Sequence, residues 1–215
     1  MKMAWWTWLT FQLLRIHALL LLVMGRSNAA LACFDRLLRI RPHDCHALAS
    51  QAHSHAQRGS FDKAIESLRL LTQLRPQDPS GWFNLGFALQ QRGEQGQAGG
   101  AFRHALAIDH RLDRAWYGLA LVFTDLRQYQ EAAVALEKTT ALQPMCPHGW
   151  FKLAQVRQAL GQHDEAFKIV EHLRQFEPKV AAQLEGVLDL MLPATASLGN
   201  SDISVVITRV AGHAA

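Results

Sequence analysis

The sequence WFNLGFAL at residues 82–89 has two counterparts further along the chain, WYGLALVF at 116–123 and WFKLAQVR at 150–157. Each segment opens with tryptophan and a second aromatic residue, and has leucine at its fourth position and glycine or alanine at its fifth. This i, i+3, i+4 spacing places the three side chains on one face of a helix. The interval from Trp82 to Trp116 equals that from Trp116 to Trp150, which indicates an internal repeat that supplies one such helix per copy.

Three other residue types keep the same period along the chain. The glycines are expected to end each first helix, because glycine adopts a left-handed backbone without strain. The alanines fall on a second helix, and the prolines stop that helix before the next repeat. The series are Gly25, Gly59, Gly93 and Gly161, with Arg127 in the remaining position; Ala30, Ala64, Ala98, Ala132 and Ala166; and Pro42, Pro76, Pro144 and Pro178, with His110 in the remaining position.

The run of Trp82, Leu85, Gly86 and Leu89, followed by Phe102, resembles the tetratricopeptide repeat pattern. The resemblance implies an all-α fold, a right-handed superhelical solenoid of antiparallel helix pairs with a C-terminal capping helix. The small residue at Gly86 is expected to let a second helix approach closely. The expected boundaries are 1–10 for a hydrophobic lead, 11–44, 45–78, 79–112, 113–146 and 147–180 for five repeats, 181–192 for the capping helix and 193–215 for a mobile tail with a strand-prone stretch at 203–210.

A second set of side chains lies on the first helix of each repeat, beside the packing stripe. In the tetratricopeptide family this face lines a concave groove that binds extended or helical peptides, and aromatic and amide side chains suit a peptide with apolar residues. The resemblance therefore implies a groove, with two of its members at the margins. The candidate groove residues are Phe83, Asn84, Phe87, Gln90, Gln91, Tyr117, Leu121, Phe151, Lys152, Gln155 and Gln158, with His53 and Arg114 at the margins.

Two interpretations of these aromatic side chains stay open, since they could instead complete the packing between repeats. The groove predicts a scaffold or adaptor that binds a protein or peptide partner at a membrane-associated assembly. The alternative is an accessory or regulatory subunit, or a chaperone-like factor, of a separately encoded enzyme or secretion complex. Recognition of a terminal carboxylate is not expected, because only Asn84 and Arg114 fit that subtype, whereas Ala49, His53 and Gly118 do not.

The composition favours a folded protein that does not bind nucleic acid. Hydrophobic residues make up 49 % of the 215 residues and charged residues 19 %, which is too apolar for a disordered chain. The net charge is +4, and residues 1–44 alone carry six basic and two acidic side chains. A nucleic-acid-binding protein normally spreads basic residues over its working surface, whereas here they accompany the most hydrophobic stretch.

That hydrophobic stretch, residues 4–24, allows three interpretations. It is long enough for a membrane span, but Arg15 near its centre would cost roughly 2.5–3.5 kcal/mol. A signal peptide could be cleaved near 27–29, at the loss of half a repeat. We favour a first repeat helix with an additional apolar face, which rests on a partner or on a membrane surface. The expected location is cytoplasmic in association with the membrane, and the alternative is export or anchoring through this segment.

No catalytic, cofactor-binding or metal site is expected from the motifs. His43, Cys45, His46, His53 and His55 are close in sequence, but His46 and His53 lie ~10.5 Å apart along a helix axis. The glycines between 93 and 100 do not follow a strand, so they fail the context of a dinucleotide-binding loop. The three cysteines form no framework pattern, which suggests reduced thiols. We therefore expect a protein without enzymatic activity, cofactor or metal.

Overall fold

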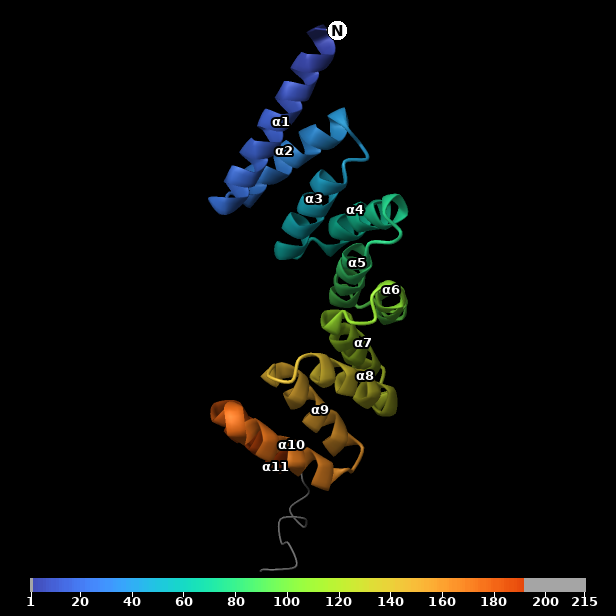
Figure 1. Ribbon diagram of the computed structural model, residues 1–215, viewed down its shortest axis with the longest axis vertical. Helices are drawn as coiled ribbons and strands as arrows, with labels where there is room; N and C mark the ends of the chain where they lie inside the picture. Colours follow the sequence, from blue (N-terminus) through green and yellow to red (C-terminus); the bar gives the residue numbers. More distant parts are fainter. Residues whose placement is uncertain (1, 192–215) are drawn as a thin grey trace, which may run out of the picture. The chain divides into compact units, whose positions relative to one another are not determined.

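The computed structural model describes the backbone of residues 2–191 and the side chains of 8–188 (Figure 1). The expected tail at 193–215, with its strand-prone stretch, lies outside the described residues. Packing divides the chain into two units, of which the first ends at Leu142 and the second begins at Gln143. The helices in the described part are α1 (Lys2–Val23), α2 (Ser27–Ile40), α3 (Cys45–Gln57), α4 (Phe61–Leu74), α5 (Pro79–Gln91), α6 (Gln95–Ile108), α7 (Asp113–Asp125), α8 (Tyr129–Leu142), α9 (Pro147–Ala159), α10 (His163–Phe176) and α11 (Pro178–Met191).

The helices of the first unit form consecutive pairs, in which each helix packs against the one before and the one after it (Figure 1). This arrangement confirms the expected all-α repeat of helix pairs. From α3 onward, each pair begins and ends within one of the expected repeats. The second unit contains the pair α9 and α10, and α11 packs on both of them. Helix α11 begins at Pro178, three residues before the expected start of the capping helix.

The first helix differs from its expected boundaries. Helix α1 runs without interruption from Lys2 to Val23, so it contains residues 2–10 of the expected lead as well as the first helix of the repeat 11–44. Its Phe11, Ala18 and Leu21 are buried against α2, in one hydrophobic cluster. None of the helices in the described residues is both long and apolar enough to cross a membrane.

The turn inside each helix pair uses the left-handed backbone predicted for the glycine series. Gly25, Gly59, Gly93 and Gly161 have φ between 71° and 87°. The turn at Gly59 is closed by the Ser60 N–H, which donates to the His55 carbonyl at 2.9 Å. Arg127 takes the same conformation with φ 59°, and the next N–H, of Gln128, donates to the Phe123 carbonyl at 2.8 Å. The turn is therefore kept where glycine is missing, at the cost of a strained arginine.

The tryptophan series supplies the donor of a recurring hydrogen bond, and the proline series supplies its acceptor. Each indole Nε1 donates to the backbone carbonyl six residues earlier, in the loop that enters the helix. The bonds run from Trp82 to Pro76 (2.8 Å), from Trp116 to His110 (2.9 Å) and from Trp150 to Pro144 (2.7 Å). Since the acceptor is a main-chain carbonyl, the tie does not require a proline, which explains why His110 can replace it.

Close helix approach in the first unit depends on the ring of Phe102 in α6. The ring is buried, and it lies against Gly86 of α5 and Gly118 of α7. A methyl group at Gly86 would lie 2.7 Å from Phe102 Cδ1, and one at Gly118 would lie 2.6 Å from Cζ. Both separations are far shorter than a carbon–carbon contact of ~3.5–4.0 Å. The expectation for Gly86 is thus confirmed, and Gly118 has the same role from the other side.

Gln51 is in register with Leu85, Leu119 and Leu153 of the later repeats, and its side chain links three helices. Its Nε2 donates to Asp35 Oδ1 of α2 at 2.7 Å, and its Oε1 accepts from Ser67 Oγ of α4 at 2.8 Å. Both ends of the amide are therefore paired, so a half-buried polar group is tolerated at this position. At this position the second repeat uses hydrogen bonds, whereas the three later repeats bury a leucine.

Replacing Arg127 by glycine should stabilise the protein. Relief of the left-handed backbone, ~1–2 kcal/mol, outweighs the extra chain entropy of glycine, ~0.5–1 kcal/mol. We expect Arg127→Gly to raise the free energy of unfolding by roughly 0.5–1 kcal/mol in urea denaturation. Arg127→Ala is the control, because it removes the side chain and keeps the strain. An equal gain in both variants would show that the side chain, and not the backbone, is responsible.

Adding one methyl group at Gly118 should destabilise the first unit. Gly118→Ala forces Phe102 to move within a packed core, which costs ~1–3 kcal/mol. Gly100→Ala is a matched control inside α6, since nothing lies within 4 Å of the added carbon. The control should gain up to ~1 kcal/mol from helix propensity. Opposite signs in chemical denaturation support the packing role of Phe102, and a neutral Gly118→Ala would contradict it.

Candidate hydrophobic groove

A hollow of about 310 Å³ lies between α3, α5 and α7 in the first unit. Its walls are mostly apolar, and three of the residues at its edge are polar or charged. The lining consists of Ala49, Ala52, His53 and Ala56 from α3, Leu68 from α4, Phe83, Asn84 and Phe87 from α5, and Arg114 from α7. Five of these residues, His53, Phe83, Asn84, Phe87 and Arg114, are among the groove candidates selected from the sequence. The structure therefore brings the candidates of three helices into one place.

The two phenylalanines of the hollow have different environments. Phe83 is half-buried, and its ring centroid lies 6.0 Å from that of Phe102. The packing interpretation therefore holds in part for Phe83. Phe87, one turn further along α5, keeps 44 % of its surface exposed. An exposed phenylalanine inside a hollow is an apolar surface that a ligand could cover.

The polar edge of the hollow is positively charged at Arg114. Its guanidinium carbon lies 4.9 Å above the centroid of the Phe83 ring, a cation–π contact that holds the side chain at the rim. His53 and Asn84 are exposed on the neighbouring helices. Among the nine lining residues none is acidic. The rim thus offers a cation and an amide beside an apolar interior.

The hollow exists because the second repeat has small side chains where later repeats have large ones. Ala49 is in register with Phe83 and Tyr117, and Ala56 is in register with Gln90. Sequence reasoning missed Ala49, Ala52, Ala56 and Leu68, because it searched for aromatic and polar side chains. The repeat register could have found Ala49 and Ala56 as positions that lack bulk. Space left by alanines is what a pocket requires.

The other candidates on α5 and α7 do not line this hollow. Gln90, Tyr117 and Leu121 are half-buried, and Gln91 is exposed. The candidates Phe151, Lys152, Gln155 and Gln158 belong to α9 in the second unit. Gln158 is buried there, and its Oε1 lies 2.7 Å from Nδ1 of His163. The side chain is therefore buried inside its own unit, with the oxygen of its amide paired there.

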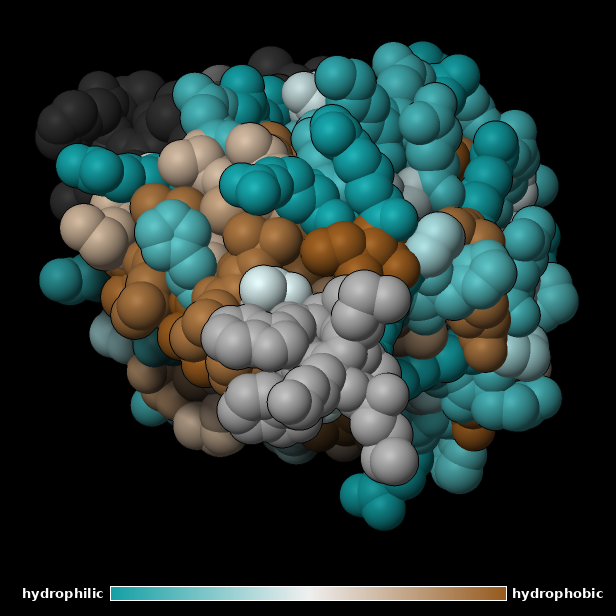
Figure 2. Space-filling model, turned by 90° about the horizontal axis from the view of Figure 1, so that it is seen from above, coloured by the Kyte–Doolittle hydropathy of each residue, from teal (hydrophilic) through white to brown (hydrophobic). Residues whose placement is uncertain are grey.

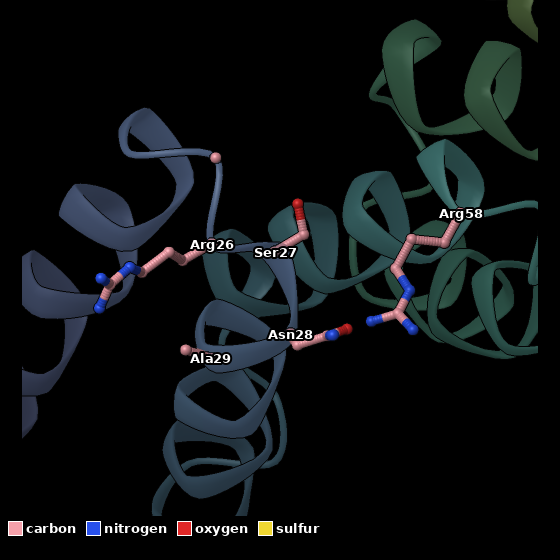
Figure 3. Close-up of a pocket in the computed structure, with 6 residues that line it drawn as sticks. Arg26, Ser27, Asn28, Ala29 and Arg58 are labelled. Carbon is pink, nitrogen blue, oxygen red and sulfur yellow. The ribbon is translucent and has the colours of Figure 1, made fainter.

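A second hollow, of about 570 Å³, lies at the start of α2 (Figure 3). It is lined by Gly25, Arg26, Ser27, Asn28, Ala29 and Arg58. Figure 3 shows the Arg26 side chain directed away from Arg58, while Asn28 and Arg58 extend toward each other. The lining side chains are exposed or half-buried. Water can therefore reach their polar groups, and these groups do not require a ligand as a partner.

A third hollow, of about 260 Å³, contains a histidine whose protonation is disfavoured. His55 lies there with Asp35, Arg58 and Lys63 among its neighbours. Burial lowers the pKa of His55 below its usual value of 6.5, and the nearby positive charge of Lys63 lowers it further. Asp35 acts in the opposite direction but does not cancel these effects. The folded protein therefore favours neutral His55.

The histidines and cysteines of the second repeat are not gathered around one point. Among the described residues, no group of three histidine, cysteine or acidic side chains is placed to hold a metal ion. Cys33 is buried and Cys45 and Cys146 are half-buried, all three as free thiols.

The geometry defines a helical-repeat protein with an apolar hollow on the first helices of its repeats. Two tetratricopeptide repeat family models match the sequence, one at residues 52–93 and the other at residues 117–176. The chain is therefore a tetratricopeptide repeat protein. Repeats of this family are interaction scaffolds that bind proteins or peptides, and they are in general non-catalytic.

Several solved structures share this fold. MamA from Desulfovibrio magneticus RS-1 matches with a TM-score of 0.74 and 20 % identity, over 79 % of this chain and 96 % of that chain. PilF from Pseudomonas aeruginosa matches with a TM-score of 0.67 and 16 % identity, over 86 % of this chain and 92 % of that chain. YrrB, described as a TPR protein with an unusual peptide-binding site, matches with a TM-score of 0.67 and 13 % identity, over 79 % and 88 %. A comparison with curated protein sequences finds no match.

His55 should make the stability of the first unit depend on pH. Because its pKa is lower in the folded state than in the unfolded chain, the unfolded chain binds more protons below about pH 6.5. Stability should therefore be constant above that pH and fall as the pH drops below it. We expect His55→Asn to reduce this loss in thermal melts between pH 7.5 and roughly 5. NMR titration should show Lys63→Ala raising the pKa of His55, and an unchanged value would contradict the assigned cause.

Proposed function

We propose that this protein binds a peptide segment of a partner protein in the hollow between α3, α5 and α7. The observation that carries the proposal is the exposed ring of Phe87 within a concave apolar surface, beside Arg114. Apolar surface that is exposed to water in a hollow has a free-energy cost, and this cost is removed when a ligand covers the surface. Burial of such a ring is a common source of binding energy in interfaces.

The size of the hollow limits what can enter it. Its volume of about 310 Å³ is at the lower end of the ~300–1,000 Å³ found for ligand pockets. This space suits one large or two small apolar side chains of a peptide. The remainder of the peptide would lie along the faces of α5 and α7, where Gln90, Gln91, Tyr117 and Leu121 are candidates for further contacts.

The side chains at the rim indicate which peptide residues would lie next to the apolar side chain that enters the hollow. Arg114 would pair with a carboxylate of the peptide, since a guanidinium forms two parallel hydrogen bonds with it. Asn84 can donate to and accept from the peptide backbone. With Arg114 and His53 at the rim and no acidic residue in the lining, an acidic peptide is favoured over a basic one. The proposed ligand is an apolar side chain flanked by aspartate or glutamate.

The remaining expectations about function stay predictions. The candidates of α9, namely Phe151, Lys152, Gln155 and Gln158, would extend the binding surface in the second unit. Association with a membrane through residues 4–24, and the role of accessory subunit to a separate enzyme or secretion complex, also stay predictions.

Truncating Phe87 should weaken peptide binding without affecting the fold. Peptides are first selected from a random displayed library on the wild-type protein, and their Kd values are then measured by fluorescence anisotropy. We expect Phe87→Ala to raise the Kd at least ~10-fold, which corresponds to ~1.4 kcal/mol. Arg114→Gln should weaken the binding of acidic peptides and reduce its dependence on salt.

Phe167→Ala is the matched control for these variants. Phe167 is a similarly exposed phenylalanine on α10, outside the hollow. The control should bind the selected peptides as the wild type does, and circular dichroism should show equal helicity in all variants. Selected peptides that bind Phe87→Ala with an unchanged Kd would rule out the hollow as their site.

A further inference from the structure

Helix α1 carries a second apolar stripe on the side that does not pack against α2. The stripe consists of Leu9, Leu13, Ile16, Leu20 and Val23, which are spaced alternately by four and three residues. Leu9 is half-buried, and the other four side chains are 53–86 % exposed. The opposite face, with Phe11, Ala18 and Leu21, is buried in the cluster formed with α2. The stripe is therefore an exposed apolar face of α1, separate from the face that forms the core with α2.

Figure 2, which views the molecule from the end where α1 lies, shows hydrophobic side chains gathered at the surface there. Trp8, Leu19 and Met24 are exposed on the same helix or directly after it, at the borders of the stripe. Contiguous apolar surface of this extent is uncommon on a soluble protein and marks a surface that is covered in the working state.

The repeat register shows which interface this face corresponds to. Leu13 and Leu20 are in register with Ala47 and Ser54 of α3, and with Gly81 and Ala88 of α5. All four of those residues are buried. A methyl group at Gly81 would lie 3.7 Å from Thr72 Cγ2 of α4, which is the preceding helix. In α3 and α5 this face therefore packs on the helix before it, whereas in α1 the described residues leave it open.

The residues of the stripe are not those of an ordinary repeat face. The residues in register with Leu9, Ile16 and Val23 are His43, Ser50 and Gln57 in and before α3, and Gln77, Asn84 and Gln91 in and before α5. The later repeats thus combine small central residues with polar borders. Only α1, among the first helices of the first unit, has large aliphatic residues at all five positions. Leucine-sized side chains would hold a neighbouring helix at ~8–10 Å and interdigitate with it.

We propose that α1 pairs with α1 of a second copy of this chain, stripe against stripe. The alternating spacing of four and three residues is that of a helix seam whose side chains insert between those of a partner helix. A stripe of identical composition on a second copy is self-complementary about a two-fold axis, which is the commonest symmetry of protein dimers. Ile16, the middle member, then lies next to its counterpart.

The charges around α1 favour a second copy over a lipid surface. A helix that lies on a membrane normally has a strongly charged polar face opposite its apolar face. In α1 the opposite face is buried in the core, and Arg15 is the sole arginine or lysine between residues 8 and 23. Arg15 is half-buried, and it lines a hollow with His46 and Ala47 of α3, away from the stripe. Pairing of two stripes in a dimer therefore brings no like charges together.

The exposed area is also of the right order for a dimer. Seven apolar side chains on α1 and directly after it keep 46–86 % of their surface exposed, and a standard interface buries ~800 Å² per partner. These side chains are Trp8, Leu13, Ile16, Leu19, Leu20, Val23 and Met24. The α3–α5–α7 hollow is a separate surface, so dimerisation and peptide binding can be tested independently.

The test measures the mass of the full chain in solution by light scattering after size-exclusion chromatography. We expect the wild type to be a dimer and Leu13→Gln/Leu20→Gln to be a monomer with equal helicity. Val134→Gln/Phe167→Gln, two exposed apolar residues on α8 and α10, should remain a dimer. A wild type that is monomeric at all concentrations, or a double variant that stays dimeric, would overturn the proposal.

A disulfide trap tests the pairing while the other four residues of the stripe stay unchanged. In a background of Cys45→Ser and Cys146→Ser, Ile16→Cys should form a covalent dimer as its main product under mild oxidation. Val134→Cys, at an equally exposed position on α8, should remain at background. Equal yields from both variants would contradict α1 pairing.

Flotation on phosphatidylcholine and phosphatidylglycerol vesicles tests whether the stripe binds lipid instead. If a monomeric wild type floats with the vesicles and Leu13→Gln/Leu20→Gln does not, the stripe binds lipid and the dimer proposal is overturned.

Discussion

The arrangement of the first unit depends on how closely Phe102 lets α5 and α7 approach. Its ring fills the space that two glycines, Gly86 and Gly118, leave open on those helices. The same ring contacts Phe83, and Arg114 lies over the ring of Phe83. Packing at native density transmits such a constraint, since neighbouring side chains have no room to adjust separately. The position of Phe83 in the wall of the hollow therefore depends on where Phe102 lies.

A second constraint positions each first helix on the loop before it. The indole of Trp82, and of its equivalents in the next two repeats, satisfies a loop carbonyl while its ring contributes apolar area. Trp82 also stacks on His104 of α6, with ring centroids 4.6 Å apart. One side chain therefore joins a loop and two helices. This recurring contact explains why tryptophan is periodic, and why the proline that supplies the carbonyl is replaceable.

The two surfaces proposed for interaction arise by opposite means. The hollow between α3, α5 and α7 arises from missing volume, because Ala49 stands in register with Phe83 and Tyr117, and Ala56 in register with Gln90. The stripe on α1 arises from added volume, because leucine, isoleucine and valine stand where later repeats have small or polar residues. In both cases the departure from the repeat, and not the repeat itself, creates a surface that a partner can recognise.

The sequence by itself determined the helix pairs and their turns, because each depends on local chemistry that recurs once in every repeat. Even Arg127 was recognisable as a position that requires a left-handed backbone. The resemblance to the family also selected Phe83 and Phe87 on one face of α5, and Arg114 at the margin on α7. Only the tertiary structure decided that Ala49 and Ala56 open the hollow, that Gly118 accommodates Phe102, and that Gln158 is buried within its own unit. These outcomes depend on which side chains from other helices fill the space, and a periodic pattern along one chain does not contain that information.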